Sequence, residues 1–441
     1  MKDCDLECSR REFFKKLGMF SGIGALSGIA ASSLFLPSLA RGGASGTAGA
    51  GASRGAGGSA TSSTVRGAGS AASRAGGGAR GGTAAQASAA TMEEPSQGST
   101  SEKTRRKEAM FYKKHPEMQV ECELCPRKCK VGDIERGYCG VRENRDGVYY
   151  SLVYALPCAV HIDPIEKKPL FHFLPGTNAF SLGTAGCNMD CKFCQNWEMS
   201  QARPEQTENF YLPPKEVVGK AKQTSSSSIA FTYSEPGVVA IEYMLDTAIE
   251  GNKSGIKTVM ISNGYINREP MLEAVKHLGA VKVDLKAFTE KYYKEVCDAT
   301  LKPVLDTLVL LKNAGAWCEI VYLVVPTLND SDSELTSMSK WIAQELGPDV
   351  PLHFSRFYPI YKMKKLPQTP ISTLEKARKI AMNTGLHYVY IGNVPGHEGE
   401  NTYCPGCKRP VVKRIGFSIV EEKISAGRCG YCKTKIAGVW G

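Results

Sequence analysis

The sequence predicts an α/β fold built on a parallel sheet, with small cysteine-rich modules before and after it. Between residues 180 and 391, short β-branched runs alternate with amphipathic stretches. A regular strand–helix–strand order favours parallel pairing with right-handed crossovers, and therefore a barrel or partial barrel. The 441 residues, 42% hydrophobic and 22% charged, are enough for one large core and smaller modules besides.

Residues 1–40 resemble a twin-arginine export signal. Arg10 and Arg11 are paired, Phe13 follows them, and an uncharged run from Leu17 ends in small residues at Ala40. The run is also long enough for an uncleaved membrane anchor, but its glycines and serines make it weakly apolar and favour a signal. We therefore expect periplasmic export, and a cytoplasmic protein if the signal is not used.

Residues 41–107 are dominated by Gly, Ala, Ser and Thr, a composition that predicts a flexible, disordered linker. The formal charge of the whole chain is +11, but residues 1–107 hold 14 basic and 7 acidic side chains. Most of the basic excess therefore lies in the leader and the linker. This distribution argues against a nucleic-acid-binding surface on the folded part.

The 16 cysteines exceed what packing needs, and most of them fall into three groups. Two more, Cys4 and Cys8, lie in the leader. Close C-x2-C pairs suit a metal better than a disulfide in an intracellular or oxygen-poor setting. Three single cysteines are expected to be small buried hydrophobes, namely Cys158, Cys297 and Cys318.

Residues 108–170 form a predicted N-terminal module organised around the first cysteine group. The segment is polar and rich in turns, so a metal would have to supply its folding energy. Zinc is the default interpretation, and a second iron–sulfur cluster is the alternative. The expected ligands are Cys122, Cys125, Cys129 and Cys139.

The predicted barrel covers residues 171–395. Its strands are expected at 180–184, 229–233, 258–262, 281–285, 319–325, 352–357 and 387–391. Helices are expected between them, at 214–222, 238–252, 268–277, 302–314, 333–345 and 373–383. The site of such a barrel forms at the carboxyl ends of its strands. The residues that follow each strand are therefore candidates for function.

A cysteine loop with the spacing C-x3-C-x2-C follows the first strand and contains Cys187, Cys191 and Cys194. Three thiolates can hold three irons of a [4Fe-4S] cluster and leave the fourth iron open for a ligand. A zinc knot or a ferredoxin-type loop is the alternative. Polar residues after the other strands favour the open-iron site, and they are Ser234, Glu235, Asn263, Asp284, Lys286, Asn329 and Asp330.

Residues 396–441 form a predicted C-terminal zinc ribbon. Two C-x2-C pairs flank a segment whose alternation predicts a β-hairpin at 411–415 and 417–420. Two such knuckles on a hairpin are typical of a closed, tetrahedral zinc site. The expected ligands are Cys404, Cys407, Cys429 and Cys432.

Motifs spread over residues 120–441 resemble the radical S-adenosylmethionine (SAM) enzyme of the AmmeMemoRadiSam group, which is similar to pyruvate formate-lyase activating enzymes. The resemblance implies a radical SAM partial (βα)6-type TIM barrel within the α/β class. The motifs that carry it are the cysteine loop with residues 195–197, and residues 124–126, 163–170, 172–176, 232–236 and 284–286.

The resemblance also implies roles for individual residues. The three cysteines of the loop would ligate the [4Fe-4S] cluster, and the Phe193 backbone would help to seat the SAM adenine. Residues 234–236 resemble a loop that meets the SAM amino group, although they lack its paired glycines. The candidates for SAM contacts are Ser234, Glu235, Asn263, Asp284, Lys286 and Arg356. The alternative is an ion pair that only stabilises the fold, and it applies to Asp284, Lys286 and Arg356.

The activity implied by the resemblance is reductive cleavage of SAM to a 5′-deoxyadenosyl radical, which takes a hydrogen atom from a substrate. A one-electron donor such as flavodoxin or ferredoxin is the implied partner, together with a protein substrate or the companion proteins of the AmmeMemoRadiSam group. Glycyl-radical activation is one implied use of the radical. A non-catalytic iron–sulfur and zinc adaptor, or an electron carrier, is the alternative function.

Overall fold

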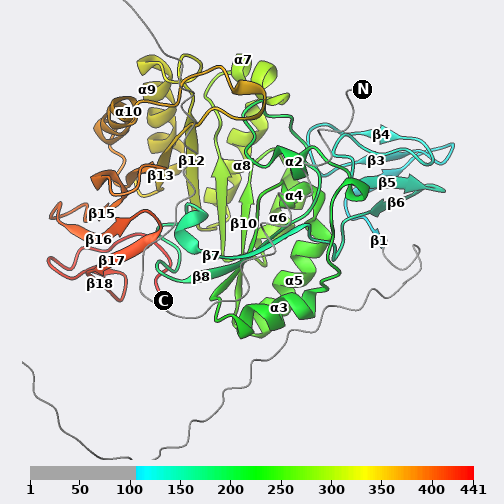
Figure 1. The fold of residues 1–441 in the computed structure, drawn as a ribbon, viewed down its shortest axis with the longest axis horizontal. Coiled ribbons are helices and arrows are strands. Elements are labelled where there is room, and N and C mark those ends of the chain that lie inside the picture. Colours follow the sequence, from blue (N-terminus) through cyan, green and yellow to red (C-terminus); the bar gives the residue numbers. More distant parts are fainter. Residues whose placement is uncertain (1–105) are drawn as a thin grey trace, which may run out of the picture. The chain divides into compact units, whose positions relative to one another are not determined.

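Figure 1 shows the computed structural model, which describes residues 106–441. The predicted signal at 1–40 lies outside the described residues, as does the predicted linker up to residue 105. Lys107, the last residue of that linker, lies in β1 (Lys107–Glu108), which pairs with β6 (Val148–Ser151). Regular structure therefore includes the end of the predicted linker.

An eight-stranded sheet with the order β14-β13-β12-β11-β10-β9-β8-β7 forms the centre of the described fold. Neighbouring strands from β8 to β14 are parallel, and β7 pairs antiparallel with β8. The sheet is open, with β7 and β14 as its edges. The bounds are β7 (Ala159–Pro164), β8 (Asn178–Gly183), β9 (Ser228–Phe231), β10 (Lys257–Ser262), β11 (Ala280–Asp284), β12 (Cys318–Val324), β13 (Leu352–Arg356) and β14 (Val389–Gly392).

All seven predicted strands are confirmed, with ends that differ by a few residues. Six of the parallel strands, β8 to β13, are each followed by a helix that leads to the next strand, in agreement with the six strand–helix units that the resemblance implied, and β14 is the seventh strand. One detail of the prediction needs correction. The strand β7 belongs to this sheet, although residues 108–170 were assigned to the N-terminal module. Its sequence AVHIDP mixes charged and apolar residues and ends in proline, so it lacks the pattern of a buried strand.

Helices connect the parallel strands, and α5, α8 and α10 contact β10, β12 and β14. One predicted helix, 238–252, is divided in two, because the φ of −128° at Ala240 lies outside the helical range. No helix within residues 106–441 is long and apolar enough to cross a membrane. The bounds are α2 (Trp197–Ser200), α3 (Pro214–Gln223), α4 (Pro236–Val239), α5 (Ile241–Lys253), α6 (Arg268–Val275), α7 (Glu290–Tyr292), α8 (Lys302–Asn313), α9 (Asp332–Trp341) and α10 (Ile371–Asn383).

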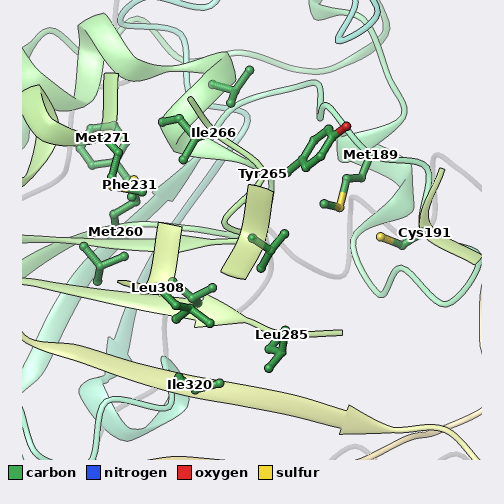
Figure 2. Close-up of a cluster of buried hydrophobic side chains, with 14 of the residues drawn as sticks. Met189, Cys191, Phe231, Met260, Tyr265, Ile266, Met271, Leu285, Leu308 and Ile320 are labelled. Carbon is green, nitrogen blue, oxygen red and sulfur yellow. The ribbon is translucent and has the colours of Figure 1, made fainter. Parts of the chain in front are cut away.

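The two faces of the sheet are covered differently, because successive side chains of a strand point to opposite faces. Phe231, Met260 and Ile320 belong to the large buried cluster that also contains residues of α6 and α8 (Figure 2). Ala230 and Val259, one position away in their strands, belong to a second cluster. The segment after β7 fills that cluster with Ile165, Leu170 and Phe173.

The N-terminal cysteine module consists of two small antiparallel sheets. One contains β1, β6 and β5 (Arg142–Arg145), and the other contains β2 (Tyr112–Lys114), β3 (Val120–Cys122) and β4 (Lys130–Val131). The module packs on the central fold through a buried ion pair in which Arg142 binds Glu242 of α5, with both side chains at most 1% exposed.

The C-terminal module contains the predicted hairpin, formed by β16 (Pro410–Ile415) and β17 (Ser418–Glu422), with β15 (Thr402–Tyr403) beside β16. A second short pair contains β18 (Ile424–Ser425) and β19 (Arg428–Cys429). The module is joined to the segment after β7, because Arg414 Nη2 donates to the Phe171 carbonyl over 2.9 Å. The chain terminus is joined to the same segment, since the Val439 amide donates to the His172 carbonyl.

Candidate functional site

The cysteine loop lies between β8 and α2, at the carboxyl edge of the sheet. It begins with Gly186, whose φ is +92° and whose missing Cβ would lie 2.7 Å from the carbonyl oxygen of Cys139. A side chain does not fit there, so glycine allows the loop to touch the N-terminal cysteine module. Burial raises the pKa of the Cys187 thiol well above its ordinary value. Cys191 is 8% exposed and lies at the edge of the cluster in Figure 2.

Asn263 lies directly after β10, Glu235 lies between β9 and α4, and the two residues are held together. Glu235 Oε1 accepts from the Ser262 hydroxyl over 2.7 Å, and Oε2 accepts from the Asn263 amide over 2.6 Å. Burial raises the pKa of the Glu235 carboxyl to about 7. Asn263 Nδ2 lies 3.8 Å from Cys187 Sγ and donates to Asn188 Oδ1 over 2.9 Å. These bonds connect two strand ends with the cysteine loop.

Asp284 is the last residue of β11, and it forms an ion pair with Lys286, with 3.5 Å between Lys286 Nζ and Asp284 Oδ2. Asp284 also pairs with Lys282. Burial opposes the charge on Lys286, but Asp284 and Cys191 outweigh it, and the pKa of Lys286 is raised. The ion pair that the sequence left open therefore exists, and it lies beside the cysteine loop.

Phe193 and Arg356 have different surroundings. The Phe193 ring is buried, with its centroid 6.2 Å from that of Tyr292 and 5.6 Å from Lys286 Nζ. Arg356 ends β13 on the same sheet edge, and its Nε donates to the Thr369 carbonyl over 2.7 Å. This contact is with a backbone oxygen, whereas the sequence left a carboxylate partner open. Ser234 is half-buried between Tyr233 and Glu235.

Three residues of this region were not among the site residues predicted from the sequence. Asn188 bridges the loop to Asn263, and it also donates to the Tyr265 carbonyl over 2.7 Å. Cys297 is fully buried, as predicted, but its thiol donates to Cys191 and lowers the Cys191 pKa. Tyr292 has a buried hydroxyl without a hydrogen-bond partner. The contacts of Asn188 and Cys297 join distant parts of the chain, which no local pattern indicates.

The donor set fits a cluster with one open iron and an amino-acid ligand. Three thiols supply iron ligands, while a carboxylate, an amide and an ammonium lie on the neighbouring strand ends. The hydroxyl of Tyr292, a residue whose ring centroid lies 6.2 Å from that of Phe193, has no hydrogen-bond partner. Since buried hydroxyls are almost always hydrogen-bonded, this atom indicates a polar ligand in the same region.

Comparisons with known proteins agree with this arrangement. Residues 181–337 match the model of the radical SAM superfamily. An uncharacterised protein of Methanocaldococcus jannaschii, MJ0808, is 46% identical over 332 residues, which cover 75% of this chain and 98% of that protein. The chain belongs to the radical SAM superfamily. A radical SAM protein of this kind holds a [4Fe-4S] cluster and uses SAM, and the residues above fit both.

Two further similarities are more distant. A pyruvate formate-lyase-activating enzyme of Clostridium pasteurianum is 26% identical over 163 residues, which cover 36% of this radical SAM protein and 66% of that enzyme. Among solved structures, Streptococcus suis SuiB bound to S-adenosylmethionine is similar with a TM-score of 0.40 and 13% identity. That similarity covers 52% of this chain and 53% of SuiB.

The C-terminal cysteines of this radical SAM protein are arranged for a single metal ion. Their four sulfur atoms all lie within 4.8 Å of one another, and the Cys404–Cys432 and Cys407–Cys429 sulfurs are 3.5 and 3.8 Å apart. Four thiolates around a tetrahedral zinc ion, with Zn–S bonds of about 2.3 Å, lie about 3.8 Å apart. The predicted grouping of these cysteines is therefore confirmed.

Proposed function

We propose that this protein cleaves SAM reductively and uses the product for hydrogen abstraction. When bound, the cluster and SAM supply a 5′-deoxyadenosyl radical, which takes a hydrogen atom from a substrate at the carboxyl edge of the sheet. The observation that carries the proposal is the position of Asn263. Its side chain contacts Cys187, and its backbone amide binds Glu235.

The residues of the chain have separate tasks in this proposal. The three loop cysteines hold iron, and the other side chains position SAM and keep water away from it. Lys286 supplies a positive charge for the SAM carboxylate. Glu235 and Asn263 supply hydrogen-bond acceptors for the SAM amino group, and Phe193 helps to seat the SAM adenine. The other polar side chains proposed to contact SAM at this edge of the sheet are Ser234, Asp284 and Arg356.

The finer proposal is that the substrate is a glycine of a partner protein, as in glycyl-radical activation. The similarity to a pyruvate formate-lyase-activating enzyme supports it. The resemblance to the AmmeMemoRadiSam group supports companion proteins of that group as partners. EPR spectroscopy of the reaction with each candidate partner protein, recorded without a spin trap, tests this step. A glycyl-radical doublet on the partner is expected, and SAM cleavage without any protein radical would exclude this class of substrate.

The decisive experiment for SAM cleavage is anaerobic reconstitution with iron, sulfide, dithionite and SAM. Formation of 5′-deoxyadenosine, measured by mass spectrometry, is the expected result. A chain that holds the loop cluster but forms no 5′-deoxyadenosine would instead be a non-catalytic adaptor or electron carrier.

Export of the protein is a further proposal. The twin-arginine pattern at residues 1–40 supports export of the folded enzyme, and mass spectrometry of the mature N-terminus tests cleavage after Ala40. Recovery of active protein with Met1 intact would contradict it.

The C-terminal cysteines are proposed to hold zinc as a structural site, which elemental analysis of purified protein tests.

A further inference from the structure

The four cysteines of the N-terminal module lie together around its loops. The Cys122 amide donates to the Cys129 carbonyl over 2.9 Å, and the Lys128 amide donates to the Cys125 carbonyl. Cys122 and Cys125 are 6% and 5% exposed. Cys139 is the fourth, just before β5.

Two buried polar atoms beside these cysteines have no hydrogen-bond partner. Arg142 is fully buried; its Nε donates to the Val238 carbonyl and its Nη2 to Glu242, but its Nη1 has no partner. The hydroxyl of fully buried Tyr149 is also unpaired. It lies beside Cys129, since a Cβ at Gly137 would be 2.6 Å from that hydroxyl and 3.6 Å from Cys129 Cβ. Since buried donors are almost always hydrogen-bonded, these two unpaired atoms indicate an acceptor beside the cysteines.

The sulfur spacing of this group differs from that of a single metal ion. Among the groups of metal-ligating side chains in residues 106–441, only the C-terminal four have sulfurs all within 4.8 Å of one another. The cysteines of the radical SAM loop do not, and neither do the N-terminal four. Thiolates that bind different irons of a cluster lie farther apart than thiolates on one zinc ion. The N-terminal group therefore resembles the cluster-binding loop rather than the ribbon.

The two cysteine groups are neighbours in space. Gly186, the residue before Cys187, packs against the carbonyl of Cys139. Arg127, in the loop between Cys125 and Cys129, donates from Nε to the Asn188 carbonyl over 2.7 Å. A cavity of about 680 Å³ is lined by both Cys139 and Cys187. Few atoms therefore separate the N-terminal group from the radical SAM loop.

We propose that Cys122, Cys125, Cys129 and Cys139 bind a second iron–sulfur cluster, which passes electrons to the radical SAM loop. One electron leaves a reduced carrier protein of the flavodoxin or ferredoxin class, which becomes oxidised by one electron. The electron reduces the second cluster and then moves to the loop, where SAM cleavage consumes it. The second cluster returns to its oxidised state, and no other reactant is needed. This role rests on the proposed function, but the metal site itself does not.

The test uses the full chain after anaerobic reconstitution, with Cys129→Ser as the variant and Cys318→Ser as the control. Cys318 lies at the start of β12, outside all three cysteine groups. Iron and sulfide content per chain should fall in Cys129→Ser and stay constant in Cys318→Ser, while zinc stays constant in both. Loss of zinc with unchanged iron would overturn the proposal.

The electron-transfer role is measured as a ratio of two rates of 5′-deoxyadenosine formation. Dithionite is small enough to reduce the loop directly, whereas flavodoxin is expected to need the second cluster. Cys129→Ser should therefore lose at least tenfold more of the flavodoxin-driven rate than of the dithionite-driven rate. Equal losses with both reductants would refute the relay. No product with either reductant in the wild type would refute SAM cleavage, while iron content would still decide the metal site.

A conservative variant covers the case in which Cys129→Ser does not fold. Tyr149→Phe removes only the unpaired hydroxyl beside the cysteines. The EPR spectrum of the reduced wild type should contain two signals, and Tyr149→Phe should shift the reduction potential of one of them, because hydrogen bonds to the sulfurs tune a cluster. A single signal in the reduced wild type, assigned to the loop by its response to SAM, would overturn the second cluster.

Discussion

Glu235 accepts a 2.6 Å hydrogen bond from the backbone amide of Asn263. The bond joins the segment between β9 and α4 to the end of β10, the parallel strand beside β9. It leaves the Asn263 side chain free to reach Cys187. The carboxylate therefore has a structural task as well as its proposed contact with SAM, and substitutions must separate the two.

Glu235→Gln separates them. A glutamine oxygen can still accept from the Asn263 amide, and its amide nitrogen can donate to the Ser262 hydroxyl, so the fold should persist. The charge is lost, and a hydrogen bond to a charged group contributes about 1.5–3 kcal/mol. We expect SAM affinity of the reconstituted protein to fall by about 10- to 100-fold. Equilibrium dialysis measures it, and an unchanged Kd would remove Glu235 from the SAM site.

Cys191 and Cys297 provide a matched pair of variants. Both are buried and in contact with each other, but only Cys191 belongs to the C-x3-C-x2-C loop. Cys191→Ala should lose the loop cluster and all 5′-deoxyadenosine formation. Cys297→Ala should retain both, with a small loss of stability. Iron analysis and product detection are the measurements, and equal iron loss in the two variants would make Cys297 a ligand.

The sequence predicted best what depends on short spacing or on regular alternation. The loop cysteines are identified by local spacing, and the seven parallel strands by β-branched runs. Since parallel strands end at one edge of a sheet, Glu235, Asn263 and Asp284 could be placed near the loop from the sequence alone. The C-terminal four cysteines were predictable for the same reason, because two C-x2-C pairs on a hairpin converge.

What the sequence could not predict depends on contacts between distant segments. Cys297 looked like an isolated hydrophobe, because its contact with Cys191 forms only when the turn after α7 packs on the loop. The unpaired atoms of Arg142 and Tyr149 appear only once their other neighbours are known. The interruption at Ala240 was also hidden, since the residues around it have an uninterrupted helical pattern.

Arg414 should be necessary for the attachment of the C-terminal module. Its guanidinium is fully buried, lies 3.7 Å from Glu166 Oε1 and donates to the Phe171 carbonyl. Arg414→Met leaves the Glu166 carboxylate buried without its cation, which should cost about 3–5 kcal/mol of unfolding free energy. Denaturant unfolding measures the loss. The double variant Arg414→Met, Glu166→Gln should recover part of it, and a simple sum of the two single losses would contradict the pairing.

His172 should make the attachment of the same module sensitive to acid. Its neutral ring is fully buried, with Nδ1 2.6 Å from the Ala437 carbonyl and Nε2 against the Tyr390 hydroxyl. Burial lowers the pKa of His172 to about 4, against the opposing effect of Glu319, while Arg414 and His353 act in the same direction as burial.

The direction of the effect follows from this lowered pKa. In the unfolded chain His172 takes up a proton as the pH falls below about 6.5, whereas the folded protein does not until about pH 4. Its contribution to stability is therefore complete above about pH 6.5 and is lost as the pH falls to 4, by about 3 kcal/mol.

Thermal unfolding between pH 4 and 7 measures this loss. His172→Gln can keep an acceptor toward Tyr390 but does not titrate, so its stability should fall less over the same range. Zinc content must be followed in both proteins, since protonation of the C-terminal cysteines also releases metal at low pH. Parallel pH profiles for the wild type and His172→Gln, at equal zinc content, would show that another group causes the acid sensitivity.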